Sequence, residues 1–243
     1  MHNTFRAILA MTTFLVTGAL SSCNHTDELE PESPAPQIVF LFSPGGLGDM
    51  SYNDRILEGV QRFKMENGDI DIYIYSPESL QEAEKIFADW LERPQSSIPV
   101  LFVLGSSDYE PMAELYLAEH DLTPNKSILL FESRKQYKDE NIHTFQISMF
   151  GASYLAGMDI DQSSLSNRIT GSVIKHIDQL IYRYLTEWVV TGDMPENQLY
   201  GLESGYADWL VAPRYVNDFS SLVNGMRPQA MIFEKEYYET SGY

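Results

Sequence analysis

One stretch of the sequence decides how this chain folds: Phe42-Ser43-Pro44-Gly45-Gly46-Leu47-Gly48-Asp49-Met50-Ser51-Tyr52-Asn53. It follows an apolar run that ends at Phe42, and it precedes a segment whose apolar residues recur with helical spacing. Its glycines let the backbone approach a ligand closely and adopt positive φ angles, and Asp49 or Ser51 can cap the helix that follows. The stretch therefore predicts a strand, a loop and a helix in succession.

The start of that helix has the properties of a ligand site. A helix amino terminus presents N–H groups without intrahelical partners, which favour a polar ligand. Tyr52 adds an aromatic face and Asn53 adds a side-chain amide. One alternative stays open at this point, because glycine-rich turns between strands and helices are common in α/β folds and mostly serve only to turn the chain.

The amino terminus has the features of an export signal. Arg6 provides a thin positive region, residues 7–19 are apolar, and Leu20-Ser21-Ser22 places small residues before Cys23. The pattern resembles the lipobox of bacterial lipoproteins. That resemblance implies cleavage after residue 22 and a lipid on Cys23, so that the mature chain is tethered to a membrane outside the cytoplasm, periplasmic or surface-exposed. The alternative is a plain secretory signal with a chance cysteine.

The charge and the cysteine content exclude several classes of function. The formal net charge is −19 at pH 7, and removal of residues 1–22 takes away only the positive charge of Arg6. So acidic a surface argues against nucleic acid and anionic lipid head groups as partners. Cys23 is the only cysteine, so a lipidated mature chain has neither a disulfide nor thiolate chemistry.

The remaining sequence divides into a tether and an alternating region. Residues 23–36 are rich in acids and prolines and predict a disordered tether. From residue 37 onward, strand patterns alternate with helical patterns, which predicts an α/β fold with a mostly parallel, doubly wound sheet; residues 37–157 form the predicted ligand-binding lobe. Ligands in such folds bind at the carboxyl ends of the strands, which here begin polar stretches at Ser43, Ser76, Gly105 and Glu132.

Three motifs occur in a fixed order along the chain. The first motif consists of Gly45-Gly46 followed by Asp49-Met50-Ser51-Tyr52-Asn53 and Gly59-Val60. The second is Ala152-Ser153-Tyr154-Leu155-Ala156-Gly157. The third consists of Asp159-Ile160-Asp161-Gln162-Ser163 followed by Gly171-Ser172-Val173-Ile174-Lys175-His176-Ile177-Asp178. Together they resemble the basic membrane protein family, the lipoprotein solute-binding subunits of ABC importers that take up purine nucleosides. The resemblance covers residues 37–212 and implies a type I periplasmic-binding-protein fold, a nucleoside-like small-molecule ligand and an ABC permease as partner.

The chain also departs from the family's pattern. In the family, most of a second α/β lobe separates the second motif from the third, whereas here only Met158 lies between Gly157 and Asp159. We therefore expect that most of the lobe that closes over the ligand is missing. In addition, Ser43 stands where the family's first loop begins with an aspartate that binds the sugar, and a hydroxyl binds a ribose more weakly than a carboxylate does.

Carried over residue by residue, the resemblance implies one ligand site. Tyr52 matches the aromatic that stacks on the base and Asn53 the amide that reads it, while Glu132 matches the aspartate that ends the equivalent family strand. Asp159 and Lys175 match an acid and a lysine from the family's second half. The alternatives are that Tyr52 is a core aromatic residue, that Glu132 is a solvated acid and that Lys175 is an ordinary surface lysine. The predicted ligand-binding residues are Ser43, Gly45, Gly46, Tyr52, Asn53, Glu132, Asp159 and Lys175.

Residues 158–243 form the predicted remnant of the second lobe and its hinge. The sequence from Thr170 to Val190 predicts one long amphipathic helix that stops at Gly192. The tail after residue 197 is rich in tyrosine, and the resemblance implies that it returns as a strand. Its aromatic residues form an interaction face or pack back onto the body of the protein.

Motifs for catalysis, metals and cofactors are absent from the sequence. The histidines have no metal-ligand spacing, and there is no H-E-x-x-H, Walker, G-x-S-x-G or full G-x-G-x-x-G pattern. We therefore expect neither enzymatic activity nor a cofactor. Two functions remain: a lipoprotein that binds a nucleoside-like molecule for uptake or sensing, and a degenerate binding-protein relic that acts as a non-catalytic surface lipoprotein in protein–protein interaction.

Overall fold

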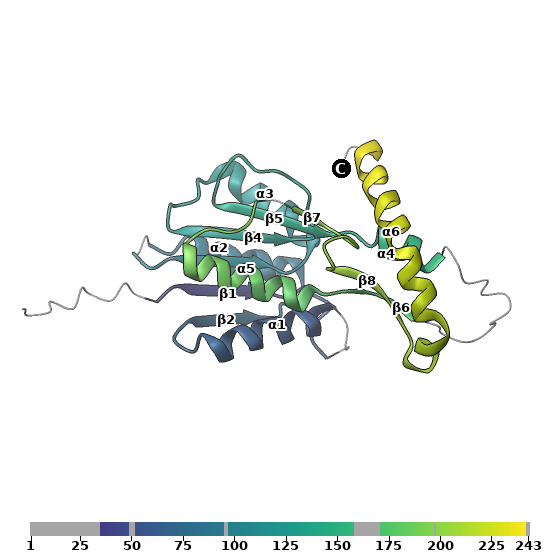
Figure 1. Ribbon diagram of the computed structural model, residues 1–243. Coiled ribbons are helices and arrows are strands. Elements are labelled where there is room, and N and C mark those ends of the chain that lie inside the picture. The colour runs from purple at the N-terminus through teal and green to yellow at the C-terminus, as the bar shows by residue number, and fades with distance from the viewer. Residues whose placement is uncertain (1–34, 49–51, 95–96, 158–170, 197, 242–243) are drawn as a thin grey trace, which may run out of the picture. The chain divides into compact units, whose positions relative to one another are not determined.

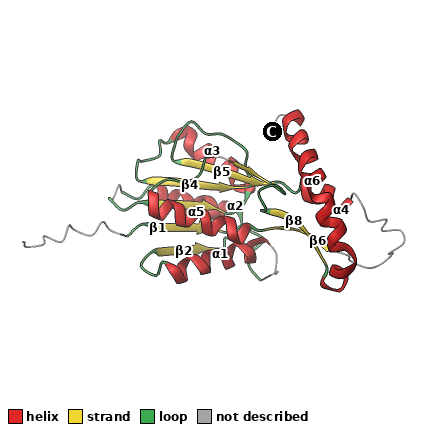
Figure 2. Cartoon of the chain, in the orientation of Figure 1, coloured by secondary structure: helices red, strands yellow, loops and turns green. Residues whose placement is uncertain are grey.

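The computed structural model describes residues 35–48, 52–94, 97–157, 171–196 and 198–241. The predicted signal sequence, Cys23 and Asp159 lie outside these ranges. In chain order the elements are β1 (Gln37–Leu41), α1 (Tyr52–Glu66), β2 (Asp71–Tyr75), α2 (Leu80–Leu91), β3 (Val100–Leu104), η1 (Ser107–Tyr109), α3 (Glu110–Glu119), β4 (Lys126–Phe131), β5 (Ile142–Ile147), α4 (Phe150–Gly157), β6 (Gly171–Lys175), α5 (Ile177–Thr191), β7 (Gln198–Tyr200), β8 (Ala207–Val211), η2 (Pro213–Tyr215) and α6 (Val216–Ser241) (Figures 1 and 2). Within this part of the chain, no helix has both the length and the apolar character that crossing a membrane requires.

The main sheet has six strands in the order β2-β1-β3-β4-β5-β7, all of them parallel. The prediction of a mostly parallel, doubly wound α/β sheet is therefore confirmed. From β1 the chain moves outward to β2 and then returns to β3 on the other side of β1. The carboxyl ends of β1 and β3 are therefore a switch point, which is where ligands bind in folds of this type.

Alternate residues of the strands divide the core between the two faces of the sheet. Phe40 in β1 and Val103 in β3 pack with residues of α1 and α5, whereas Leu41 and Leu104 pack with residues of α2 and α3. All four side chains are fully buried. Strands that are buried on both faces need continuous apolar runs, which explains why the sequence predicted them well.

Helices α1 and α5 touch at Gly59. A Cβ atom on this residue would lie 2.3 Å from the backbone oxygen of Asp178 and 2.5 Å from Cγ2 of Ile181. The two helices therefore approach each other more closely than any side chain at this position would allow. The contact fixes α1, and with it Tyr52, against α5.

The prediction of one helix from residue 170 to residue 190 is wrong. Gly171–Lys175 forms β6, which pairs antiparallel with β8, and α5 begins only at Ile177. Glycine weakens a helix, and β-branched Val173 and Ile174 favour a strand, so the local sequence agrees with the pairing. The predicted stop is confirmed, because Gly192 caps α5 in the left-handed conformation with a φ of 77°.

The tail contains a helix that the sequence analysis missed. Residues 198–200 return as a strand of the main sheet, but α6 then extends over 26 residues and packs against α4 and β8. Its aromatic side chains lie on the body of the protein: Tyr237 stacks on Phe150 with ring centroids 3.9 Å apart, and Phe233 contacts Tyr154. These rings therefore contribute to packing rather than to an open aromatic surface.

Candidate functional site

The glycine loop after β1 is held from inside by Asn53. Its Nδ2 donates to the carbonyl of Gly46 at 2.6 Å and to Oγ of Ser43 at 2.8 Å, and its Oδ1 accepts from that hydroxyl at 3.1 Å. Gly46 and Gly48 have φ angles of 77° and 100°, which a side chain would make costly. Asn53 is only 4% exposed. These bonds commit its amide to the loop, which differs from the ligand contact that the resemblance implies.

A buried tyrosine connects the loop after β3 to the end of β1. The hydroxyl of Tyr109, in η1, donates to the carbonyl of Phe42. Burial, with a smaller contribution from the charge of Asp108, raises the pKa of Tyr109, so the hydroxyl remains a donor. A Cβ atom on Gly105 would lie 2.9 Å from the carbonyl oxygen of Leu41, so the two strand ends are also close to each other.

Three predicted site residues meet at the carboxyl end of β4. Glu132 follows this strand, Tyr52 begins α1 and Lys175 ends β6. The Nζ of Lys175 donates to Oε1 of Glu132 at 2.8 Å, and the hydroxyl of Tyr52 donates to the same oxygen at 3.4 Å. The backbone N–H of Ile147 donates to Oε2 at 3.3 Å. One carboxylate thus joins the start of α1 to the ends of β4, β5 and β6.

The backbone of Glu132 is strained. Its φ is 56°, in the left-handed region that residues with side chains rarely adopt, and such conformations concentrate at functional sites. The side chains of Lys175 and Glu132 are 24% and 16% exposed, so solvent reaches the ion pair.

Tyr52 contributes a neutral hydroxyl to this cluster. Burial, followed by the charge of Glu132 and the hydrogen bond to it, raises the pKa of Tyr52 well above its ordinary value. The cluster of Tyr52, Glu132 and Lys175 therefore carries one negative and one positive charge at neutral pH. This balance suits hydrogen bonding to neutral polar groups better than the capture of an ion.

The structure places most of the predicted site residues at one edge of the main sheet. Ser43, Gly45, Gly46 and Asn53 build the loop after β1, and Tyr52, next to Asn53, connects that loop to Glu132 and Lys175. Sequence reasoning missed Tyr109 and Ile147. Neither belongs to a motif, and their contacts depend on the pairing of the strands that precede or contain them.

Three pockets that are lined by described residues lie away from this cluster. One of 390 Å³ is lined by His143, Tyr137 and four acids, one of 260 Å³ lies between β8 and α6, and one of 310 Å³ lies beside Glu234. Burial lowers the pKa of His143, although Asp193 at 3.9 Å opposes this effect. Across the described ranges, no three histidine, cysteine or acidic side chains are grouped so that they could hold a metal ion.

Comparisons with known proteins place the fold. No family model matches the sequence, and no curated protein matches it. The structure is similar to "ABC transporter system solute-binding proteins" from Aeropyrum pernix K1, with a TM-score of 0.59 and 13% identity over 84% of this chain and 86% of that one. It is also similar to a transcriptional activator of the comK gene from Bacillus halodurans, with a TM-score of 0.53 and 11% identity over 86% and 99% of the two chains. At these identities the likeness concerns the fold alone: the chain shares the overall α/β fold of these two structures, one of which is an ABC transporter solute-binding protein.

Proposed function

We propose that this chain is a membrane-anchored, non-catalytic solute-binding lipoprotein of the basic membrane protein type, which binds a nucleoside-like molecule outside the cytoplasm for ABC-type uptake or sensing. The observation that carries the proposal is the meeting of Tyr52, Glu132 and Lys175 beside the glycine loop, at the carboxyl edge of the main sheet. The fold of ABC transporter solute-binding proteins supports the class of function.

The chemistry of these groups fits a neutral, hydroxyl-bearing ligand with an aromatic base. The ring of Tyr52 packs against the core and is half-buried, so it offers only its remaining exposed part for stacking on a base. The carboxylate of Glu132 and the ammonium of Lys175 accept from and donate to ribose hydroxyls. A ligand hydroxyl can replace the long bond of 3.4 Å between Tyr52 and Glu132 while the ion pair stays in place. The glycine backbone allows close approach on the other side.

Isothermal titration with inosine, guanosine and adenosine tests the proposal. We expect micromolar binding to the chain without its predicted signal, loss of binding in Tyr52→Ala, and weaker binding in Lys175→Met. Tyr73→Ala, at a partly exposed position on the edge strand β2, is the matched control and should bind as the unaltered chain does. A folded protein that gives no heat with any of the three nucleosides contradicts the proposal.

The lipid anchor has a test of its own. Cells that express the full chain and are fed a clickable fatty acid should label it, and Cys23→Ser should abolish the label while the protein is still made. Equal label on both chains would mean that lipid is attached elsewhere, and no label on either chain would mean that no lipid is attached.

The second candidate, a relic that acts in protein–protein interaction, is favoured by one specific observation. Glu234 of α6 lies buried against the loops that follow β5 and β7, so the tail covers part of the carboxyl edge of the sheet. Because α6 occupies part of this edge, less of the edge is left to enclose a small ligand. If the folded protein gives no heat in the nucleoside titrations, this second candidate is the better explanation of its function.

A further inference from the structure

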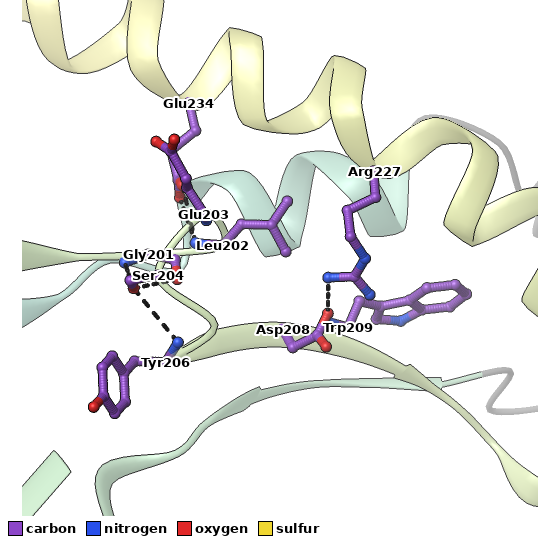
Figure 3. A network of polar contacts seen from close by, with 9 residues as sticks. All are labelled: Gly201, Leu202, Glu203, Ser204, Tyr206, Asp208, Trp209, Arg227 and Glu234. Atoms are coloured by element: carbon purple, nitrogen blue, oxygen red, sulfur yellow. Dashed lines mark hydrogen bonds and ion pairs between the residues drawn. The ribbon is translucent and has the colours of Figure 1, made fainter. Parts of the chain in front are cut away.

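A buried carboxylate of α6 is surrounded by backbone donors from two distant segments. Oε1 of Glu234 accepts from the N–H groups of Gly151 and Leu202, each at 3.1 Å, and Oε2 accepts from Leu202 at 2.9 Å and Glu203 at 3.3 Å. The hydroxyl of Tyr238 adds a bond of 3.0 Å to Oε1. Glu234 is 2% exposed, and Figure 3 shows it reaching from α6 toward the turn of Gly201, Leu202 and Glu203.

The space around the carboxylate is shaped to fit it. A Cβ atom on Gly201 would lie 2.4 Å from Oε1 of Glu234, and one on Gly151 would lie 2.5 Å from the same oxygen. Both donor segments therefore have glycine where the anion touches the backbone. Ser204 holds the turn in shape, because its hydroxyl accepts from the N–H of Gly201 and donates to the carbonyl of the same residue, both at 2.9 Å.

The electrostatics favour an anion here. Gly151 is in the first turn of α4, where N–H groups lack helical partners and the helix dipole is positive, and converging backbone N–H groups form anion-binding nests. The two segments follow β5 and β7, which are neighbours in the sheet. The N–H groups of Gly151, Leu202 and Glu203, which we call the nest, therefore lie at the same edge of the sheet as the predicted solute site, but on different strands.

We propose that Gly151, Leu202 and Glu203 form a carboxylate-binding site and that Glu234 is its ligand in cis, so that α6 is a built-in plug for this part of the edge. The buried, fully paired carboxylate is the bound anion that identifies the site. A small monocarboxylate takes its place when the side chain is removed. The proposal does not depend on nucleoside binding at Tyr52.

Thermal unfolding of the full chain, with formate as the probe, tests this. Glu234→Ala removes the acceptor of three N–H groups, of which those of Gly151 and Leu202 are buried, and should lower Tm by on the order of 10 °C. Sodium formate at about 100 mM should restore several degrees in this variant, because a ligand that binds only the folded state raises its stability. In the unaltered chain and in Glu236→Ala, an exposed acid of the same helix, formate should change Tm only by the general effect of salt.

Adding Gly201→Ala to Glu234→Ala provides the discriminating control. The new methyl group points into the vacated space, so formate should no longer raise Tm. An equal formate effect with and without Gly201→Ala, or an equal effect in Glu236→Ala, would overturn the proposal.

A milder variant covers the case in which Glu234→Ala does not fold. Glu234→Gln retains the shape but turns an NH₂ group toward backbone donors, so Tm should fall and formate should have no effect, because the amide still fills the nest. A Tm equal to that of the unaltered chain would show that the negative charge is not required and would also overturn the proposal.

Discussion

At the scale of single residues, buried polar side chains hold the backbone in place. Asn53 closes the glycine loop, and Lys126, 4% exposed, donates to the carbonyls of Leu91 and Arg93 at the end of α2. Glu234 ties α6 to two loops. Each of these groups is hydrogen-bonded and has at least one backbone partner, and a buried polar group costs little when it is paired in this way.

Asn53→Asp tests this account of the loop. The carboxylate cannot donate to Gly46 and would place a negative charge near its carbonyl oxygen, so the free energy of unfolding should fall by about 3 kcal/mol. Ser43→Ala removes only the hydroxyl and should cost about 1 kcal/mol. Urea unfolding of both variants measures the two losses, and an equal loss would mean that the amide is not the group that holds the loop.

The sequence indicated Asn53 as a site residue but not what it does. Its amide was expected to face a ligand, yet the loop turns back on α1 so that the nearest acceptors are Ser43 and Gly46. Glu234 was not identified, because it is one acid in a chain with 35 acidic residues. Its partners, Gly151 and Leu202, are brought to it only by tertiary structure.

At the scale of helices and strands, close packing determines where a side chain can be added. The contact of α1 with α5 at Gly59 has no space for a methyl group, whereas Gly225, in α6, has no atom within 4 Å of the place where its Cβ would lie. Replacing glycine by alanine should therefore destabilise the protein at Gly59 and stabilise it at Gly225.

Gly59→Ala should lower the free energy of unfolding by about 2 kcal/mol, because separating the helices costs more than the gain in helix propensity. Gly225→Ala should raise it by about 0.5 to 1 kcal/mol, because only propensity acts there. Chemical unfolding of the two single variants is the measurement. A stabilising Gly59→Ala would mean that α1 and α5 are not in direct contact.

The same scale explains which elements the sequence predicted. Central strands such as β1 and β3 are apolar throughout because both of their faces are covered, and that pattern is local. Strand β6 was taken for helix because its apolar residues continue the pattern of α5, although its glycine and β-branched residues favour a strand; the pairing of Val173 with Trp209 across the small sheet fixes the strand. Tertiary pairing overrode a plausible helical pattern.

At the scale of the whole molecule, buried tyrosines link stability to alkaline pH. Tyr109, Tyr184 and Tyr200 are 0%, 0% and 4% exposed, and burial is the largest of the causes that raise the pKa of each. Above the ordinary tyrosine pKa, the unfolded chain loses these protons while the folded chain keeps them. Stability is therefore fully present below that pKa and decreases as the pH rises above it.

Three such groups should lower the free energy of unfolding by roughly 4 kcal/mol per pH unit once the pH exceeds about 10. We expect cooperative unfolding by circular dichroism, with the tyrosinate absorbance of these three side chains appearing in the same transition. Tyr184→Phe should make the pH dependence shallower by about 1.4 kcal/mol per pH unit. If tyrosinate appeared fully while the protein stayed folded, these side chains would have to be accessible to solvent.

The position of β7 determines when the sheet can be completed during synthesis. Strands β1 to β5 follow one another along the chain, but β7, which covers β5, arrives only with residues 198–200. Until then β5 is an exposed edge, where another chain can add a strand, and pairing across so long a separation is slow. An emerging chain therefore exposes the edge of β5 to other chains until residue 200 has been made.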